Sequence, residues 1–327
     1  MAADDGDGLI DDGTALQERP GSDADGPQRF DAPRYGPVVR FGAVAIIAIA
    51  LLVLTYLVLV TTEPGQRLEN LALLGAELRS DAEREAALGR LSVVTVAIFA
   101  LALVAVVTTG FLRRREHLAL VAAGSMVTAV VIAEVLKMVL PRPALIEGPV
   151  WLLRNSFPSG SAAVAASIAI GALLVAPDRL RWVVLLAGVA FAALIGESVQ
   201  TTGWHRLSDT VGGVLIVIAV SAAGLAILAA TGLVAASDAA RIDTRFRAAL
   251  LIVAAGAVAL GVALALLPAV FPLLGEPVGA RRSILQTAFP LVGVGVTVLA
   301  TVAFARVIEP YSLGQRDPAL DTEPEAP

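Results

Sequence analysis

The chain has 327 residues, of which 57% are hydrophobic and 16% are charged; its mean hydropathy is +0.80 and its formal net charge is −5. Soluble globular proteins are about 45–50% apolar, with roughly a quarter of their residues charged, so this composition excludes an ordinary soluble enzyme. The sequence contains no cysteine, which excludes disulfides, thiolate nucleophiles and cysteine-based metal sites.

Both ends of the chain are acidic and poor in large apolar residues. Residues 1–37 carry nine acids and three arginines, and residues 309–327 carry five acids and one arginine, so the ends are net −6 and −4 and the middle is net +5. Segments of this composition bury too little apolar surface to fold. We therefore predict disordered tails over 1–37 and 309–327. The first is not a signal peptide, because acids stand where a basic region is needed.

Between the tails lie eight apolar stretches that are candidates to cross a bilayer, which takes about 20 residues of helix. They lie near 39–61, 91–112, 118–140, 161–176, 182–200, 209–233, 248–267 and 284–308. The sequence therefore predicts an all-α polytopic membrane protein with about eight spans.

The short connections on one side of the predicted bundle are rich in arginine. They include residues 113–115, 179–181 and 241–247, which lie in alternate loops on the same side as both tails. Cytoplasmic loops of membrane proteins carry an excess of basic residues. We therefore expect a multi-pass protein of the plasma membrane with this side and both termini in the cytoplasm.

The longest connection on the opposite side covers residues 62–90. Its leucines at positions 68, 71, 74 and 78 alternate with charged residues, a spacing that predicts an amphipathic helix. We favour an interfacial connector for this segment. A lid over a lipid site is the alternative.

Ionisable residues cluster at the span ends on this same side. Such residues are costly in a membrane and are usually functional. The cluster comprises Glu134 and Lys137 at the end of the third span, Arg142 and Arg154 in the next connection, Glu197 at the end of the fifth span, and His205 and Asp209 at the start of the sixth. Their agreement on one face of the membrane indicates a functional site there.

Three features of this cluster suit chemistry on an anion. Lys137 is the single lysine among 24 basic residues, and an ammonium group is a good point-charge ligand for phosphate, although snorkelling to the headgroups is the alternative. His205 and Asp209 are four residues apart, so they share a helix face, where a carboxylate can fix the histidine tautomer. The turn Pro158-Ser159-Gly160 precedes a helix and can aim backbone N–H groups at an anion.

Taken in chain order, these residues resemble the three motifs of the type 2 phosphatidic acid phosphatase superfamily, which also contains the vanadium haloperoxidases. Lys137 with Arg142-Pro143 resembles the first motif, and Pro158-Ser159-Gly160-Ser161 resembles the second. Ser198-Val199 with His205 and Asp209 resembles the third. The resemblance covers roughly residues 95–230.

The resemblance implies a six-helix phosphatase-like membrane core over 38–233, with an active site at its extracytoplasmic face. It implies that His205 is the nucleophile, which forms a phospho-histidine, and that Asp209 orients it. It also implies that phosphate oxygens are held by Lys137, Arg142, Ser159 and Gly160. Neither a metal nor a cofactor is implied. The spans over 248–308 fall outside the resemblance, and we expect this additional hairpin to pack against the core or to form a homodimer face.

Two positions depart from the family pattern in its phosphate ligands. Four residues separate Lys137 from Arg142, where the fullest form of the first motif has six. Val199 stands where the third motif has an arginine that clamps phosphate, and Arg154 or Arg206 is the candidate to replace it.

The third departure concerns the proton donor. Ser161 stands where the second motif has a histidine that protonates the leaving oxygen, and a serine hydroxyl is far too weakly acidic for that task. Glu197 is the candidate replacement acid, provided that it is buried. The leaving phosphate of a diphosphate needs little protonation, so we expect lipid diphosphates to be preferred to monoesters.

These observations favour an integral membrane lipid phosphatase that acts on a lipid phosphate or diphosphate, such as a polyprenyl diphosphate. The alternative is a weakened or inactive phosphatase-like protein that binds lipid phosphate or a protein partner. A transporter without phosphatase ancestry is a third class, since intramembrane charges fit it too. The expected partners are the lipid substrate and the bilayer, and no nucleic acid.

Overall fold

The computed structural model of the protein describes residues 35–237, 244–267 and 278–315. Most of the predicted tail over 1–37, and residues 316–327 of the C-terminal tail, lie outside the described residues. The described part is helical apart from two short strands. Its elements are α1 (Gly36–Thr55) with a π-helical continuation (Tyr56–Val60), α2 (Glu63–Gly75) with a 3₁₀ turn (Ala76–Leu78), α3 (Asp81–Leu91), α4 (Val96–Leu112), α5 (Glu116–Val139), α6 (Val150–Leu153), α7 (Gly160–Val175), α8 (Arg181–Thr201), α9 (Leu207–Ala230), β1 (Val234–Ala236), α10 (Thr244–Leu266), α12 (Val278–Ile308) and β2 (Tyr311–Leu313).

The prediction of an all-α polytopic membrane protein is confirmed. Six described helices are long and apolar enough to span a membrane, namely α1 with its continuation, α5, α8, α9, α10 and α12. The pair α3 and α4, bent by 46°, makes a seventh span if it counts as one. By this measure the predicted count of about eight is too high, because α7 has only 16 residues.

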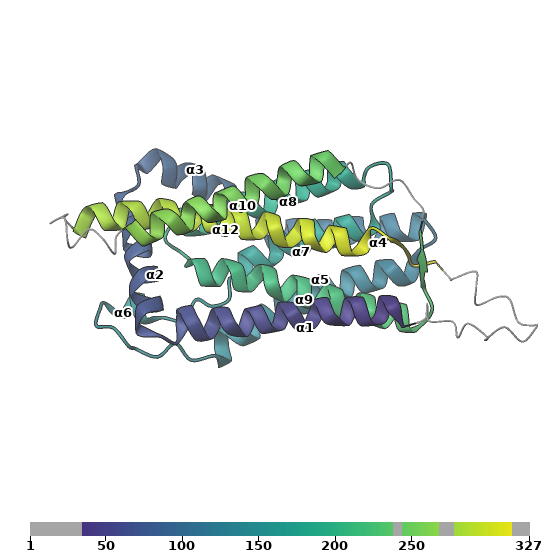
Figure 1. Ribbon diagram of the computed structural model, residues 1–327, viewed down its shortest axis with the longest axis horizontal. Helices are drawn as coiled ribbons and strands as arrows, with labels where there is room; N and C mark the ends of the chain where they lie inside the picture. Colours follow the sequence, from purple (N-terminus) through teal and green to yellow (C-terminus); the bar gives the residue numbers. More distant parts are fainter. Residues whose placement is uncertain (1–34, 238–243, 268–277, 316–327) are drawn as a thin grey trace, which may run out of the picture. The chain divides into compact units, whose positions relative to one another are not determined.

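The short helix α7 is apolar because it is buried inside the bundle. It packs against α4, α5, α8 and α9, and most of its residues are buried. A helix that is apolar on all sides belongs in an interior. In contrast, α1 and α10 expose most of their apolar side chains, as helices that face lipid do. The inner helices α7 and α9 begin with the residues of the second and third motif, which places the motifs on the axis of the bundle (Figure 1).

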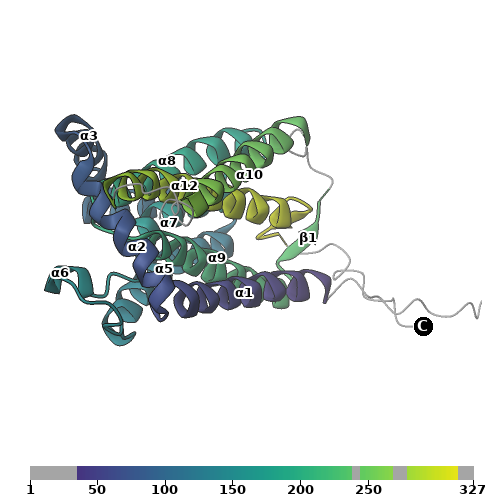
Figure 2. The ribbon, with the colours of Figure 1, turned by 60° about the vertical axis from the view of Figure 1, so that its left-hand side comes forward.

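The C-terminal helices are part of the bundle that holds the motifs. Helix α10 packs against α12, as a hairpin does, and α12 also packs against α2, α8 and α9. Figure 2 shows α12 between α10 and the helices of the motif region. Of the two expectations for this hairpin, packing against the core therefore holds for α12.

The expectation of a disordered tail from residue 309 onwards is wrong for its first residues. β2 pairs antiparallel with β1, and Leu313 is 1% exposed. Glu309 is buried and accepts hydrogen bonds from Arg247 and Arg306, so its charge is compensated inside the fold. The acidic composition of the whole segment conceals this short apolar strand, whose partner lies about 75 residues earlier in the chain.

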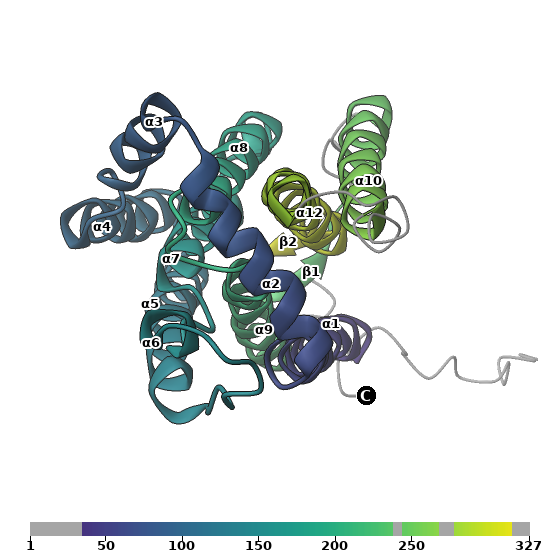
Figure 3. The same ribbon diagram turned by 90° about the vertical axis from the view of Figure 1, so that its left-hand side faces the viewer.

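Helix α2 crosses the ends of the membrane helices at the end of the bundle where the motifs lie. Figure 3 looks onto this end and shows α2 running over the ends of α7 and α9. Its buried polar residues are Gln66, Glu69 and Asn70. These three residues form a polar face that points into the protein, whereas Glu63 and Arg67 on the same helix are exposed.

Candidate functional site

The three motifs meet at one end of the bundle. The side chain of Asn155 donates to the backbone carbonyl oxygens of Lys137 (3.1 Å) and Leu140 (2.9 Å), which ties the second motif's loop to the end of α5. The backbone N–H of Ser159 donates to the carbonyl oxygen of Asp209 at 2.8 Å, which ties the same loop to α9. Elements far apart in the sequence thus form one site.

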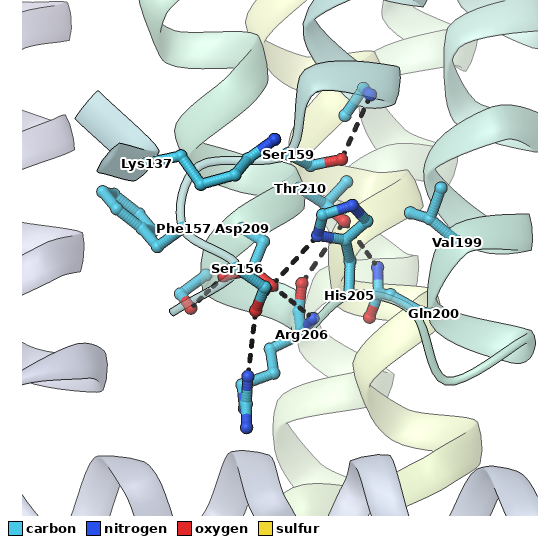
Figure 4. A network of polar contacts seen from close by, with 12 residues as sticks. Lys137, Ser156, Phe157, Ser159, Val199, Gln200, His205, Arg206, Asp209 and Thr210 are labelled. Carbon is cyan, nitrogen blue, oxygen red and sulfur yellow. Dashed lines mark hydrogen bonds and ion pairs between the residues drawn. The ribbon is translucent and has the colours of Figure 1, made fainter. Parts of the chain in front are cut away.

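His205 and Asp209 contact each other, but not across one helix face as expected, because His205 precedes the N-cap residue Arg206 and Asp209 lies in the first turn of α9. The Nδ1 of His205 lies 3.2 Å from Oδ2 of Asp209, whose side chain is fully buried. The same oxygen accepts from the backbone N–H of Arg206 at 2.8 Å and from the Ser156 hydroxyl at 2.6 Å (Figure 4). A carboxylate that accepts from Nδ1 holds the proton on that nitrogen and leaves Nε2 with a free lone pair. Nε2 is the atom that a phosphoryl group could meet.

The His205 ring lies in a nearly closed position, with its side chain 14% exposed. The cleft beside the ring is about 10 Å³ in volume and is lined by residues of α2, α8, α9 and α12, which leaves room for no more than about one water molecule. This cleft is too small to hold a phosphate group as it stands.

The turn of the second motif is tightly packed and begins α7. The Ser159 hydroxyl accepts from the backbone N–H of Ala162 at 3.2 Å and so caps the helix. A Cβ at Gly213 would lie 2.6 Å from the Ser159 carbonyl oxygen, and a Cβ at Gly160 would overlap the Glu134 carboxylate. Gly213 therefore has no room for a side chain, whereas the exposed Glu134 side chain can move away from a residue at position 160.

Lys137 lies beside this helix start. Its Nζ donates to Glu134 Oε1 at 2.8 Å, and the ammonium group lies 3.5 Å from the position of a Cβ on Gly160. Figure 4 shows Lys137 next to the turn at Ser159. The N-terminus of a helix favours anions, so the ammonium group and the α7 backbone together suit phosphate oxygens.

Arg142 contributes a buried cation with unused hydrogen-bonding capacity. Its side chain is 2% exposed, and neither terminal nitrogen has a hydrogen-bond partner among the described residues. The nearest acid is Glu69, at 3.8 Å. Burial, and then the neighbouring Arg206 guanidinium, lower the pKa of Arg142. Buried donors without partners are costly, and an anion bound here would satisfy them.

Val199 brings no charge to the site. It is fully buried, in an apolar cluster with Leu91, Ala165 and Ala169. Arg206, one of the two candidates to replace the missing clamp, donates to Asn70, to Ser156 and to the carbonyl oxygen of Leu152. It therefore anchors α2 and the loop.

Arg154, the other candidate clamp, has an exposed side chain. Arg90 of α3, which sequence reasoning missed, lies closer to the third motif. It donates to the Ser198 hydroxyl at 2.7 Å and to Glu197 at 2.8 Å. No motif includes Arg90, and only its position on a second helix brings it here.

The expectation that Glu197 replaces the missing acid does not fit the structure. One of its oxygens accepts from Arg90, and the other accepts from the Thr201 hydroxyl. Both oxygens are therefore engaged with protein donors, and the side chain is 26% exposed and so lacks the burial that the expectation requires.

Glu69 is the second residue that sequence reasoning missed. Its side chain is fully buried under α2 and accepts from the backbone N–H (2.8 Å) and the hydroxyl (3.0 Å) of Ser208. Burial, and then the charge of Asp209, raise the pKa of Glu69 to about 7. The signal in the sequence was the run Gln66, Glu69, Asn70 on one helix face, which is also typical of a solvent-facing surface.

Comparison with known proteins shows which family the motif region of this chain resembles. Residues 118–232 match the model of the PAP2 superfamily. This segment runs from α5 to the residues after α9 and includes all three PAP2 motifs described above. A comparison with curated proteins gave no match.

Among solved structures, this chain is similar to a transmembrane PAP2-type phosphatidylglycerolphosphate phosphatase from Bacillus subtilis. The identity is 21% and the TM-score is 0.39, over 57% of this chain and 92% of that one. A likeness this distant locates no functional residue. Within the described ranges, no group of three or more His, Asp or Glu side chains is arranged to hold a metal ion.

Proposed function

We propose that this PAP2 protein is a membrane lipid phosphatase that works through a phospho-histidine on His205. One observation carries the proposal: the Nδ1 of His205 is held by the buried carboxylate of Asp209. The Arg142 guanidinium, whose terminal nitrogens make no hydrogen bond within the described part of the chain, and the ammonium group of Lys137 support it, since both lie at the same end of the bundle.

Each residue has a role that follows from its position. Lys137, Arg142 and the backbone at Ser159-Gly160 hold the phosphate oxygens and offset the charge that develops on them. His205 Nε2 attacks phosphorus, and the bond to the leaving oxygen breaks. Asp209 stabilises the cationic ring that forms. Water then attacks phosphorus, the P–N bond breaks, and inorganic phosphate leaves.

The missing histidine at Ser161 bears on the choice of substrate. Loss of a general acid lowers a rate by about 10²–10⁴, or roughly 3–5 kcal/mol. Cleavage of a monoester should be slowed by this whole factor, because its alkoxide leaving group must be protonated. A leaving phosphate needs little protonation. We therefore propose that a lipid diphosphate, such as a polyprenyl diphosphate, is a better substrate than a lipid monoester.

The site is placed on the extracytoplasmic face of the plasma membrane in this proposal. The arginine-rich connections lie at the other ends of the same helices: Arg113 donates to the carbonyl oxygens of Val175 and Ala176 at the end of α7, and Arg181 pairs with Asp178 before α8. Arginine at this end favours a cytoplasmic location for it and for both termini.

The test is phosphate release by the detergent-purified protein from undecaprenyl diphosphate and from phosphatidic acid, with His205→Ala alongside. Release that is faster from the diphosphate and absent in His205→Ala is expected. Equal turnover of the two lipids would refute the substrate preference.

A second function has specific support from Ser161 and Val199, which stand where the motifs have the proton-donating histidine and the phosphate-binding arginine. It is a lipid-phosphate-binding protein without turnover. No phosphate release, with lipid diphosphate still bound in a manner that depends on Lys137 and Arg142, would favour it over the phosphatase.

A further inference from the structure

The phosphatase proposed above lacks an assigned proton donor for the leaving oxygen. Ser161 is too weakly acidic, and Glu197 is engaged with Arg90 and Thr201. Turnover of a monoester therefore needs another acid, which must lie beside the phosphate ligands and hold a proton near neutral pH. The inference below rests on the proposed phosphatase function.

Helix α2 holds one carboxyl group at the required place. Gln66 donates to the carbonyl oxygen of Pro143, next to Arg142, at 2.7 Å, and Asn70 accepts from Arg206 at 3.1 Å. These two bonds fix α2 on either side of Glu69. The Glu69 carboxyl therefore lies between the start of α9 and the buried guanidinium of Arg142, which is 3.8 Å away.

The groups around Glu69 favour its protonated form at neutral pH. From α9, the Asp209 carboxylate repels its charge, while Ser208 donates two hydrogen bonds to it. From the loop after α5, Arg142 attracts it. Burial and Asp209 outweigh Ser208 and Arg142, so the pKa lies near 7. A general acid works best when its pKa is close to the working pH.

We propose that Glu69 is the proton donor to the leaving oxygen in this protein. In the first step His205 Nε2 bonds to phosphorus, the bond between phosphorus and the leaving oxygen breaks, and the Glu69 proton passes to that oxygen. In the second step a water oxygen bonds to phosphorus while the Glu69 carboxylate takes a proton from that water. The P–N bond breaks, and inorganic phosphate leaves. Glu69 is then protonated and His205 is free.

Binding of the substrate itself reinforces this role. A phosphate dianion on Arg142 adds negative charge next to Glu69 and satisfies the guanidinium that otherwise attracts the carboxylate. Like charges in one site disfavour ionisation. Glu69 therefore gains a proton as the phosphate binds, which prepares the acid when it is needed.

A purely structural role for Glu69 makes a different prediction. Its oxygens accept from the first turn of α9 and so satisfy an N–H that lacks a partner within the helix. A glutamine can accept from the Ser208 backbone N–H through its carbonyl oxygen and donate to the Ser208 hydroxyl through its amide nitrogen, but it carries no acidic proton. Glu69→Gln therefore separates proton donation from helix capping.

The experiment compares two lipids that differ only in the leaving group, undecaprenyl phosphate and undecaprenyl diphosphate, with the purified full-length protein. In Glu69→Gln we expect kcat for the monophosphate to fall by about 10²–10⁴ and kcat for the diphosphate to fall by less than about tenfold. In the wild type, kcat/KM for the monophosphate reports the free protein and should decline as pH rises through about 7, and this decline should be absent in Glu69→Gln. Glu63→Gln, an exposed change on the same helix, should affect neither lipid.

The ratio of the two rates makes the result independent of how much variant protein folds. Three results would overturn the role of Glu69 and leave the phosphatase standing. In Glu69→Gln they are an equal fall in kcat on both lipids, or no fall on either. In the wild type it is turnover of the diphosphate but not of the monophosphate. Failure of the wild type on both lipids, or release that persists in His205→Ala, would instead overturn the phosphatase and the inference with it.

Discussion

Replacement of Asp209 by asparagine tests how the carboxylate serves His205. Three donors converge on one oxygen of Asp209, namely His205 Nδ1, the Arg206 backbone N–H and the Ser156 hydroxyl. The other oxygen lies 3.5 Å from the Ser208 hydroxyl, which can accept a bond. An amide in this place must keep its oxygen toward the three donors. The histidine tautomer should therefore survive, and only the negative charge is lost.

The expected magnitude follows from that geometry. A hydrogen bond to a charged group contributes about 1.5–3 kcal/mol, so loss of the charge should lower kcat about 10- to 160-fold. The assay is phosphate release from lipid diphosphate. Asp178→Asn, which removes a carboxylate from the ion pair with Arg181 at the other end of the bundle, is the matched control and should leave kcat unchanged.

Two results would refute this reasoning. A loss near 10⁴, the size seen when an amide inverts the tautomer of a catalytic histidine, would mean that the three donors do not orient the side chain. Unchanged activity would mean that Asp209 does not stabilise the reacting ring.

Four further outcomes are expected. Gly213→Ala should destabilise the protein by about 1–3 kcal/mol in thermal unfolding, because its Cβ would lie 2.6 Å from the Ser159 carbonyl oxygen, whereas Gly256→Ala, with open space around it, should not; equal unfolding temperatures would contradict the close packing. Arg142→Met should abolish phosphate binding, measured by calorimetry, without loss of thermal stability, since it removes a buried cation whose terminal nitrogens make no hydrogen bond to the described residues; a large fall in unfolding temperature would show that its 3.8 Å ion pair with Glu69 is structural. Because the pKa of Glu69 is raised from 4.5 to about 7, the folded chain binds the extra proton, and its stability falls as pH rises from about 4.5 to about 7. Glu69→Gln should therefore gain in relative thermal stability between pH 5 and pH 8, by at most about 3 kcal/mol, and a pH-independent difference would argue against the raised pKa. In this cysteine-free chain, Glu147→Cys should react with an impermeant maleimide on intact cells and Arg179→Cys only after permeabilisation, and the reverse pattern would invert the proposed orientation.

Several features of this protein could be predicted from the sequence because they depend on neighbours in the chain. Long apolar runs predict membrane helices, since each must satisfy its backbone within the segment. The four-residue spacing of His205 and Asp209 predicts their contact, although the structure makes it at the N-terminus of α9, where Asp209 also accepts from the Arg206 backbone N–H, and not across one helix face. The order of the motifs, from Lys137 to Asp209, predicts the PAP2 segment that the family comparison shows.

The tertiary structure alone decided the features that depend on partners distant in the chain. The polar face of α2 is buried because Ser208, Arg142 and Arg206, more than 70 residues later, supply partners for Glu69 and Asn70. Glu197 is paired because Arg90 reaches it from another helix. Burial, which raises the pKa of Glu69, is a property of the assembled bundle. Helical periodicity identifies the polar face of a segment, but only the packing of the other helices determines whether that face meets water or the site.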